Sequence, residues 1–531
     1  MKKSLSILSF ALISGSIVFA AIPDPVRLDS GSVSGAPADD AGVRAFKGIP
    51  FAAPPTSELR WKAPQPAAHW EGVRKADQFG PNCTAGGGGG RGGGKGKGPG
   101  GGGDKGPAPA KAAAPAGPAP SEDCLYVNVW TPAKSAGDRL PVMVWTYGGG
   151  FTGGSGAEGR YDGEALAKKG VIVVTYNYRL GMFGFLAHPE LTKESGHNAS
   201  GNYGLMDMAT VLRWVQKNIA AFGGDPRKVT IDGESAGAIL VAAMVGSPEG
   251  KGLFQRAIAQ SGAWMGLSIA KMRTLEQAEE TGKRAAGNHT MAELRAMTTQ
   301  DLVQAVTGVP AGIVVDGWMI PEDQSLTFAK SKQNDVDILV GSNQDEGTFF
   351  AGGPVTAETA KSRARQTYAD LADDFLKLYP ASTDAEAAAS GLMHSRDETG
   401  WHQRTWAELQ VKRGRKAYVY YFTHVPPGNG ARGATHTAEL NYMFGNPPNG
   451  ANPATAWTDA DRKLSDTMMS YWANFITTGD PNGKGLPAWQ SYSAKTDAQA
   501  MVLGDTVQFG PQIEAPRLAF FDKYYAVVEK R

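Results

Sequence analysis

The sequence predicts an α/β protein in which helices cover both faces of one large, mostly parallel sheet. Five apolar runs are continuous rather than alternating, as strands buried on both faces are. They are PVMVWTY from Pro141, VIVVTYNY from Val171, KVTIDG from Lys228, DILVGS from Asp337 and AYVYYF from Ala417. Between them lie segments such as LMDMATVLRWVQKNIAAF, whose apolar residues recur at helical spacing. Strands that alternate with helices are typical of a doubly wound sheet.

Composition places the chain among ordinary globular proteins. Its 531 residues are 41% hydrophobic and 20% charged, which is enough apolar material for a large core. The formal net charge of +1 excludes a general attraction to nucleic acid or to an acidic membrane surface. Apart from one glycine-rich insert, no shift in composition marks a second domain, so we expect residues 21–531 to form one domain.

The first twenty residues have the features of an export signal. Lys2 and Lys3 precede the apolar run LSILSFALISGSIVFA, and small residues stand at its end. This pattern predicts a signal peptide over residues 1–20, cut after Ala20, with an uncleaved membrane anchor as the alternative. No other run approaches the roughly 20 apolar residues that a membrane span requires, so we expect no stable span in the mature protein. The expected location is periplasmic or secreted, in a bacterium.

A glycine-rich stretch, GGGGGRGGGKGKGPGGGG, is followed by PAPAKAAAPAGPAP. It resembles a phosphate-binding loop only superficially, because Lys95 is followed by Gly96 and no strand leads into it. A single arginine also argues against RNA binding, so no nucleic-acid partner is expected. The composition predicts a flexible insert over residues 84–120. Its bases outnumber the single acid Asp104, so a weakly positive flap is an alternative to a plain surface insertion.

The two cysteines of the chain, Cys83 and Cys124, bracket this insert. Export to an oxidising compartment favours a disulfide between them.

The sharpest chemical signal is VTIDGESAGAIL. Residues 229–231 predict a strand, the motif G-x-S-x-G follows at Gly233–Gly237, and a helix-forming segment comes next. In α/β hydrolases this context is a sharp turn that lifts the serine hydroxyl above the sheet. The pattern therefore predicts Ser235 as a nucleophile.

A serine nucleophile requires a base, and in α/β hydrolases the chain order is serine, acid, histidine. His436 follows the predicted strand at Ala417 in a loop-like stretch, and His424 is a rival on spacing alone. The acid should follow a strand between them, where Asp345 and Glu346 are both available. The residue pattern does not choose between these two carboxylates.

The glycines of WTYGGGF, Gly148 to Gly150, follow the strand predicted at Pro141. Together with the amide of Ala236, which directly follows the nucleophile, their backbone N–H groups could stabilise an oxyanion.

Longer motifs resemble a known family. They are FKGIPFAAPPTSELRWKAPQP, EDCLYVNVWTP, WTYGGGF, YRLGMFGFL, GNYGLMDMATVLRWVQKNIAAFGGDPRKVTIDGESAGA, AIAQSG, SNQDEG and NFITTGDPN. In these stretches the chain resembles the type-B carboxylesterases, the α/β hydrolases that include cholinesterases and bacterial p-nitrobenzyl esterases. The likeness covers nearly all of the chain after the signal peptide.

The resemblance implies specific roles. It makes Ser235 the nucleophile, Glu346 the acid and His436 the base. It makes Gly149, Gly150 and Ala236 the oxyanion donors. It also implies the Cys83–Cys124 disulfide and two structural ion pairs, Arg60 with Glu122 and Arg179 with Asp207.

The expected function is that of an exported serine carboxylesterase acting on a small-molecule ester, with no metal or cofactor. The alternative is a non-catalytic adhesion or binding protein on the same fold, although such proteins typically lose the nucleophile, which is present here. Residues 84–123 contain no aromatic side chain. Cholinesterases hold the choline cation on a tryptophan in this loop, so choline esters are not the expected substrate. The sequence carries no signal for an oligomeric state.

Overall fold

The computed structural model describes residues 22–86, 119–262, 272–350, 355–448 and 452–528. The predicted signal peptide, residues 1–20, lies outside the described residues. So does nearly all of the predicted insert at 84–120, of which only the two ends are described.

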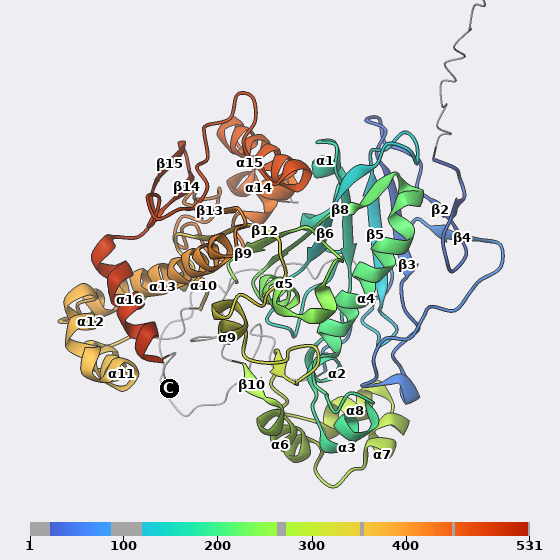
Figure 1. Cartoon of the computed structure of the whole chain (residues 1–531), viewed down its shortest axis with the longest axis horizontal. Helices are drawn as coiled ribbons and strands as arrows, with labels where there is room; N and C mark the ends of the chain where they lie inside the picture. Colours follow the sequence, from blue (N-terminus) through green and yellow to red (C-terminus); the bar gives the residue numbers. More distant parts are fainter. Residues whose placement is uncertain (1–21, 87–118, 263–271, 351–354, 449–451, 529–531) are drawn as a thin grey trace, which may run out of the picture.

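A ten-stranded sheet forms the centre of the described structure (Figure 1). Its order is β15 (Val507–Pro511), β14 (Gln499–Leu503), β13 (Ala417–Phe422), β12 (Asp337–Asn343), β9 (Arg256–Gln260), β8 (Gly224–Glu234), β6 (Leu140–Thr146), β7 (Ile172–Tyr176), β5 (Tyr126–Thr131) and β3 (Arg44–Pro50). Of its neighbouring pairs, six are parallel and three antiparallel. The antiparallel pairs lie at the two edges, so the prediction of a mostly parallel sheet is confirmed.

All five predicted strands are present, as β6, β7, β8, β12 and β13. Every residue of β7 and of β13 is buried, which explains why their sequences are continuously apolar rather than alternating. The sheet is buried because helices cover both of its faces.

Four long helices provide most of that cover (Figure 1). They are α4 (Tyr203–Asn218), α5 (Ala236–Gly246), α13 (Asp384–Lys412) and α15 (Asp459–Thr478). The helices α4 and α5 pack on each other and on β8, while α15 packs on β6 and β8 and α13 on β12 and β13. The predicted helix LMDMATVLRWVQKNIAAF is α4 together with the short 3₁₀ turn that follows it.

The described structure contains twelve further α-helices. They are α1 (Glu164–Ala167), α2 (Gly181–Phe185), α3 (Pro189–Glu194), α6 (Leu275–Ala286), α7 (Met291–Ala296), α8 (Thr299–Ala305), α9 (Gln324–Ala329), α10 (Gly347–Phe350), α11 (Ala357–Tyr368), α12 (Ala372–Leu378), α14 (Leu440–Phe444) and α16 (Ala515–Val528). Two small sheets complete the fold. One contains β1 (Val26–Arg27), β2 (Ser32–Gly35) and β4 (Val73–Ala76), and the other contains β10 (Arg273–Thr274) and β11 (Val314–Val315).

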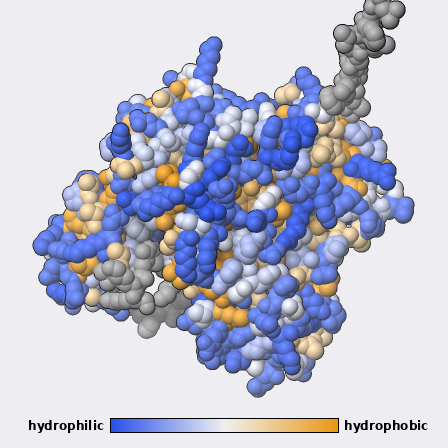
Figure 2. All heavy atoms as spheres, viewed as in Figure 1, coloured by the Kyte–Doolittle hydropathy of each residue, from blue (hydrophilic) through white to orange (hydrophobic). Residues whose placement is uncertain are grey.

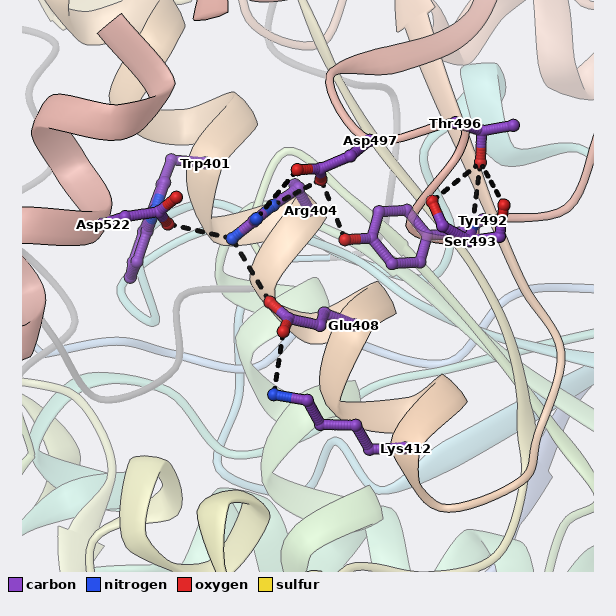
Figure 3. Close-up of polar contacts among 9 residues, drawn as sticks. All are labelled: Trp401, Arg404, Glu408, Lys412, Tyr492, Ser493, Thr496, Asp497 and Asp522. Atoms are coloured by element: carbon purple, nitrogen blue, oxygen red, sulfur yellow. Dashed lines mark hydrogen bonds and ion pairs between the residues drawn. The ribbon is translucent and has the colours of Figure 1, made fainter. Parts of the chain in front are cut away.

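The helices α11, α12, α13 and α16 enclose a second apolar cluster at the side of the molecule, separate from the main core. Arg404 of α13 ties this layer together, since its guanidinium contacts Asp497, Asp522 and Glu408 (Figure 3). Most of the face seen in Figure 2 is hydrophilic, with apolar residues scattered over it. In the part of the chain that the structure describes, no helix combines the length and the apolar character needed to cross a membrane.

The predicted disulfide joins Cys83 and Cys124, whose Cα atoms lie 5.0 Å apart. The two described ends of the insert also pair through their backbones. The amide of Thr84 donates to the carbonyl of Ser121 (3.1 Å), and the amide of Ser121 donates to the carbonyl of Asn82 (2.8 Å). The ends of the insert therefore leave the body of the protein side by side.

Both ion pairs implied by the family resemblance are present and buried. The Arg60 guanidinium donates to both carboxylate oxygens of Glu122, at 2.6 and 2.7 Å. The Arg179 guanidinium donates to both oxygens of Asp207, at 2.7 and 2.9 Å. In each pair two parallel hydrogen bonds fix one element of the fold against another.

Candidate active site

Ser235 stands at the turn between β8 and α5. Its backbone has φ 55° and ψ −122°, a region that side-chain-bearing residues rarely adopt. The turn is held from outside, because the Ser235 amide donates to the carbonyl of Gln260 (2.9 Å) at the end of β9. The next residue, Ala236, begins α5, and amides of a first helical turn have no acceptor within the helix.

The two glycines of the motif are required by close approach of the backbone. A Cβ at Gly233 would lie 2.7 Å from the carbonyl of Gly237, and a Cβ at Gly237 would collide with the carbonyl of Thr146 in β6. The prediction that these glycines serve a tight turn with closely passing backbone is confirmed.

The loop after β6 passes directly over the nucleophile. A Cβ at Gly148 would lie 2.9 Å from the Cβ of Ser235 and 2.6 Å from a carboxylate oxygen of Glu234. Gly149 and Gly150 have φ of +100° and +63°, in the left-handed region that glycine tolerates. This sequence of glycines brings backbone, rather than side chains, next to the serine.

His436 and Glu346 form a buried pair. The Nδ1 atom of His436 lies 2.5 Å from Oε2 of Glu346, and the other oxygen of Glu346 accepts from the amide of Asn343 (2.9 Å). The imidazole is 1% exposed, so its orientation is fixed by these contacts.

Asp345, the carboxylate that the residue pattern could not separate from Glu346, has a different position. Its side chain accepts from the amide of Ala434 (2.8 Å), and its own amide donates to the carbonyl of the same residue (3.0 Å). Asp345 therefore holds the loop that carries His436, whereas Glu346 contacts the imidazole itself.

His424 lies in a separate network. Its Nδ1 is 2.6 Å from Asp505, and its Nε2 is 2.8 Å from Asp461 at the start of α15. Both ring nitrogens are occupied by these carboxylates, which leaves His436 as the histidine beside the turn of Ser235.

Glu234, the residue before the nucleophile, is a member of the site that the sequence reasoning did not identify. Its Oε1 lies 3.0 Å from Nε2 of His436, at ion-pair distance but without hydrogen-bond alignment. Burial lowers the pKa of His436, but the charges of Glu234 and Glu346 outweigh burial and raise that pKa well above its usual value. The imidazole is thus surrounded by groups that favour its protonated form.

A further buried carboxylate, Glu439, lies three residues after His436, directly before α14. It accepts from Nδ2 of Asn343 (2.5 Å). Burial, with the nearby charge of Glu234, raises the pKa of Glu439 to about 8, so this group is neutral at pH 7. In the sequence, Glu234 and Glu439 are marked only by their positions close to Ser235 and His436. The motif around Ser235 does not by itself assign a role to either carboxylate.

The surroundings of the site offer room for a substrate. A cavity of about 420 Å³ borders the far limb of the glycine loop, at Thr152 to Ser155, and reaches the disulfide at Cys83. On the other side the ring of Phe349 is 5.0 Å from the His436 ring, and its side chain is more than half exposed. The described residues that line this cavity do not include Ser235 or His436, so the cavity lies beside the site, at the outer part of the glycine loop.

Comparison with known proteins agrees with this geometry. A model of the carboxylesterase family matches residues 23–521. The chain is 35% identical to the fumonisin B1 esterase of Sphingopyxis macrogoltabida, over 95% of this chain and 90% of that protein. It is 32% identical to the para-nitrobenzyl esterase of Bacillus subtilis (strain 168), over 91% of this chain and 96% of that protein. A solved structure of a PNB esterase superposes with a TM-score of 0.76 at 32% identity, covering 93% of this chain and 99% of that one.

Proposed function

We propose that this chain, which belongs to the carboxylesterase family and is a carboxylic ester hydrolase, cleaves esters through a covalent acyl-enzyme on Ser235. One observation carries the proposal: the buried Glu346–His436 pair lies against Glu234, the residue directly before a serine held at a strained strand-to-helix turn. This constellation is what activates a serine hydroxyl in unrelated hydrolases.

In the first half of the reaction, the Oγ of Ser235 attacks the carbonyl carbon of the ester while Nε2 of His436 accepts the hydroxyl proton. The negative charge that develops on the carbonyl oxygen is stabilised by the amides of Gly149, Gly150 and Ala236. When the tetrahedral intermediate collapses, the C–O bond to the alcohol breaks and the alcohol takes the proton from His436. The acyl group remains on Ser235.

In the second half, water takes the place of the alcohol. His436 accepts a proton from the water, whose oxygen attacks the acyl carbon, and the second tetrahedral intermediate releases the acid. Ser235 regains its proton from His436. Glu346 keeps the imidazole in position and stabilises it while it carries the proton.

Electrostatics sets the pH range of this chemistry. The base must be neutral to accept a proton, and the pKa of His436 is raised well above its usual value by Glu234 and Glu346. We therefore expect kcat/KM to rise with pH as His436 loses its proton.

Small-molecule carboxylic esters are the proposed substrates. The relatives support this class, since one is named for a fumonisin ester and another for a para-nitrobenzyl ester. Export from the cytosol is part of the proposal. Its support is the signal-like sequence of residues 1–20 and the disulfide between Cys83 and Cys124, a bond that persists in oxidising compartments.

An organophosphate tests the mechanism directly. Paraoxon should add one diethylphosphoryl group per chain, on Ser235, and abolish hydrolysis of p-nitrophenyl butyrate. The Ser235→Ala variant should take up no label and lose about 10⁶-fold in kcat. Ser470→Ala is the matched control. It changes a serine on α15 whose hydroxyl donates to the backbone carbonyl of Asp466, and it should take up the diethylphosphoryl group as the native protein does. Full labelling or full turnover in Ser235→Ala would refute the proposed nucleophile.

A further inference from the structure

Arg273 is a half-buried arginine that lacks a carboxylate partner among the residues the structure describes. One of its terminal nitrogens donates to the backbone carbonyl of Pro310 (2.8 Å). A guanidinium has five N–H donors, so most of its capacity is unused by this contact. By contrast, the buried arginines Arg60 and Arg179 each hold a carboxylate through two hydrogen bonds.

The electrostatic environment of Arg273 agrees with this geometry. Burial alone lowers the pKa of Arg273, and no carboxylate offsets that effect. An unmatched cation of this kind is costly to keep out of water unless a bound anion completes it.

A cavity of about 240 Å³ lies next to Arg273. Its wall includes Pro310, whose carbonyl Arg273 contacts, together with Gly308, Val309, Gly181 and Met182. The described lining residues are glycine or apolar, so the wall itself carries no charge. Arg273 is not among the described residues that line the cavity, but its hydrogen bond to Pro310 places the guanidinium against the cavity wall.

The same cavity wall reaches the glycine loop. The amide of Gly181 donates to the carbonyl of Phe151 (2.7 Å), and the Phe151 ring lies against Gly312. Phe151 directly follows Gly150, and Arg273 pairs with Val314 in the small sheet of β10 and β11. The contacts of Phe151 with Gly181 and Gly312 therefore connect the cavity wall to the loop that carries the proposed oxyanion donors Gly149 and Gly150.

We propose that Arg273 is a specificity-determining residue that binds a carboxylate carried by the ester substrate, whose hydrocarbon part occupies the adjoining apolar cavity. The guanidinium fork matches a carboxylate in two parallel hydrogen bonds, which a neutral ester cannot supply. The substrate class is then an ester with a second, anionic group, such as a half-ester of a dicarboxylic acid. This inference rests on the proposed function, because the cavity matters only if Ser235 attacks an ester beside it.

The test compares two esters with the same leaving group. Mono-p-nitrophenyl glutarate carries a carboxylate on the acyl side, and p-nitrophenyl butyrate does not. Arg273→Gln should lower kcat/KM for the glutarate half-ester about 10- to 100-fold, the range of a charge-assisted hydrogen bond, and leave the butyrate within twofold. Arg273→Lys should recover part of the loss because it restores the charge without the fork.

Arg227→Gln is the matched control. It removes the same charge near the start of β8, the end remote from Ser235, where the Arg227 side chain is 73% exposed. It should leave both esters unchanged. 4-Carboxyphenyl butyrate, with its carboxylate on the leaving group, shows which side of the ester Arg273 faces: only the ester whose carboxylate reaches Arg273 should respond to the substitution.

Outcomes separate the two proposals. Equal losses on charged and neutral esters, or no loss on either charged ester, would overturn the role of Arg273 while leaving ester hydrolysis intact. Absence of turnover of p-nitrophenyl butyrate by the native protein would instead defeat the proposed function. Should Arg273→Gln fail to fold, the inhibition constant of glutarate, measured in the native protein and in Arg273→Lys, tests the same role. Glutarate should bind more weakly to the lysine variant, and equal binding to both proteins would overturn the role of Arg273.

Discussion

The buried ion pairs of the scaffold and the candidate active site combine basic and acidic side chains in different proportions. In the scaffold, Arg60 and Arg179 each meet one carboxylate through two hydrogen bonds, so every charge is matched. In the site, the single imidazole of His436 meets two carboxylates, Glu234 and Glu346, and the charge of Glu234 also acts on a third buried acid, Glu439. Matched charges fix a structure, whereas unmatched buried charges shift proton equilibria.

A third region shows that an excess of carboxylates is not sufficient by itself. Around Arg404, three carboxylates meet one guanidinium in the outer layer shown in Figure 3. Asp497 is only partly buried there. Burial opposes its ionisation, but the hydrogen bond and charge of Arg404 outweigh burial and lower the pKa of Asp497. The raised pKa of Glu439 therefore reflects full burial as well as a nearby acid, whereas the raised pKa of His436 comes from the carboxylate charges and is opposed by burial.

The largest effect is expected from breaking a matched pair in the core. Arg179→Met leaves Asp207, which is 0% exposed, as an uncompensated buried charge. We expect the free energy of unfolding to fall by about 3–5 kcal/mol, measured by urea denaturation. Arg213→Met, which breaks an exposed pair with Glu249, should cost less than about 1 kcal/mol. Similar losses in the two variants would contradict the distinction between buried and exposed pairs.

A smaller effect, on the pH dependence of activity rather than on stability, is expected from removing one of the carboxylates around His436. Glu234→Gln removes a negative charge 3.0 Å from His436 and therefore lowers the pKa of that imidazole. Because the neutral base is the active form, the acid limb of kcat/KM should move to lower pH. A pH profile of p-nitrophenyl butyrate hydrolysis measures this shift. An unmoved or oppositely moved limb would show that Glu234 does not set the protonation of His436.

The smallest effect is expected at the periphery. Lys412 contacts Glu408 at 2.8 Å at the edge of the Arg404 network, and its side chain is 62% exposed (Figure 3). Lys412→Ala should change the free energy of unfolding by less than about 1 kcal/mol. A loss as large as that of Arg179→Met would mean that the network in the outer layer acts as a unit.

How far the sequence predicts this molecule depends on whether a feature is local. The strands β6, β7, β8, β12 and β13 were predictable because burial on both faces leaves a continuous apolar run. The strands β14 and β15 were not predicted: the apolar run of β14 is only four residues long, and β15 is an antiparallel edge strand without a buried residue.

The same limit applies to the site. The turn at Ser235 was predictable from a local motif. Residue chemistry left Asp345 and Glu346 equivalent, because they differ only in which part of the loop at 434–436 each one meets. The role of Glu234 depends on a contact with a residue 202 positions later in the chain, which no local pattern records.

The paired ends of the insert, held by Cys83–Cys124 and two backbone hydrogen bonds, have a practical consequence. Because the two ends are fixed next to each other, the length of the segment between them does not change the geometry of the rest of the fold. A sequence grafted between Thr84 and Ser121 needs only to bring its two ends side by side, as the native segment does. This position is therefore suited to a reporter, an affinity tag or a binding domain that is to be displayed next to the active site without redesign of the esterase itself.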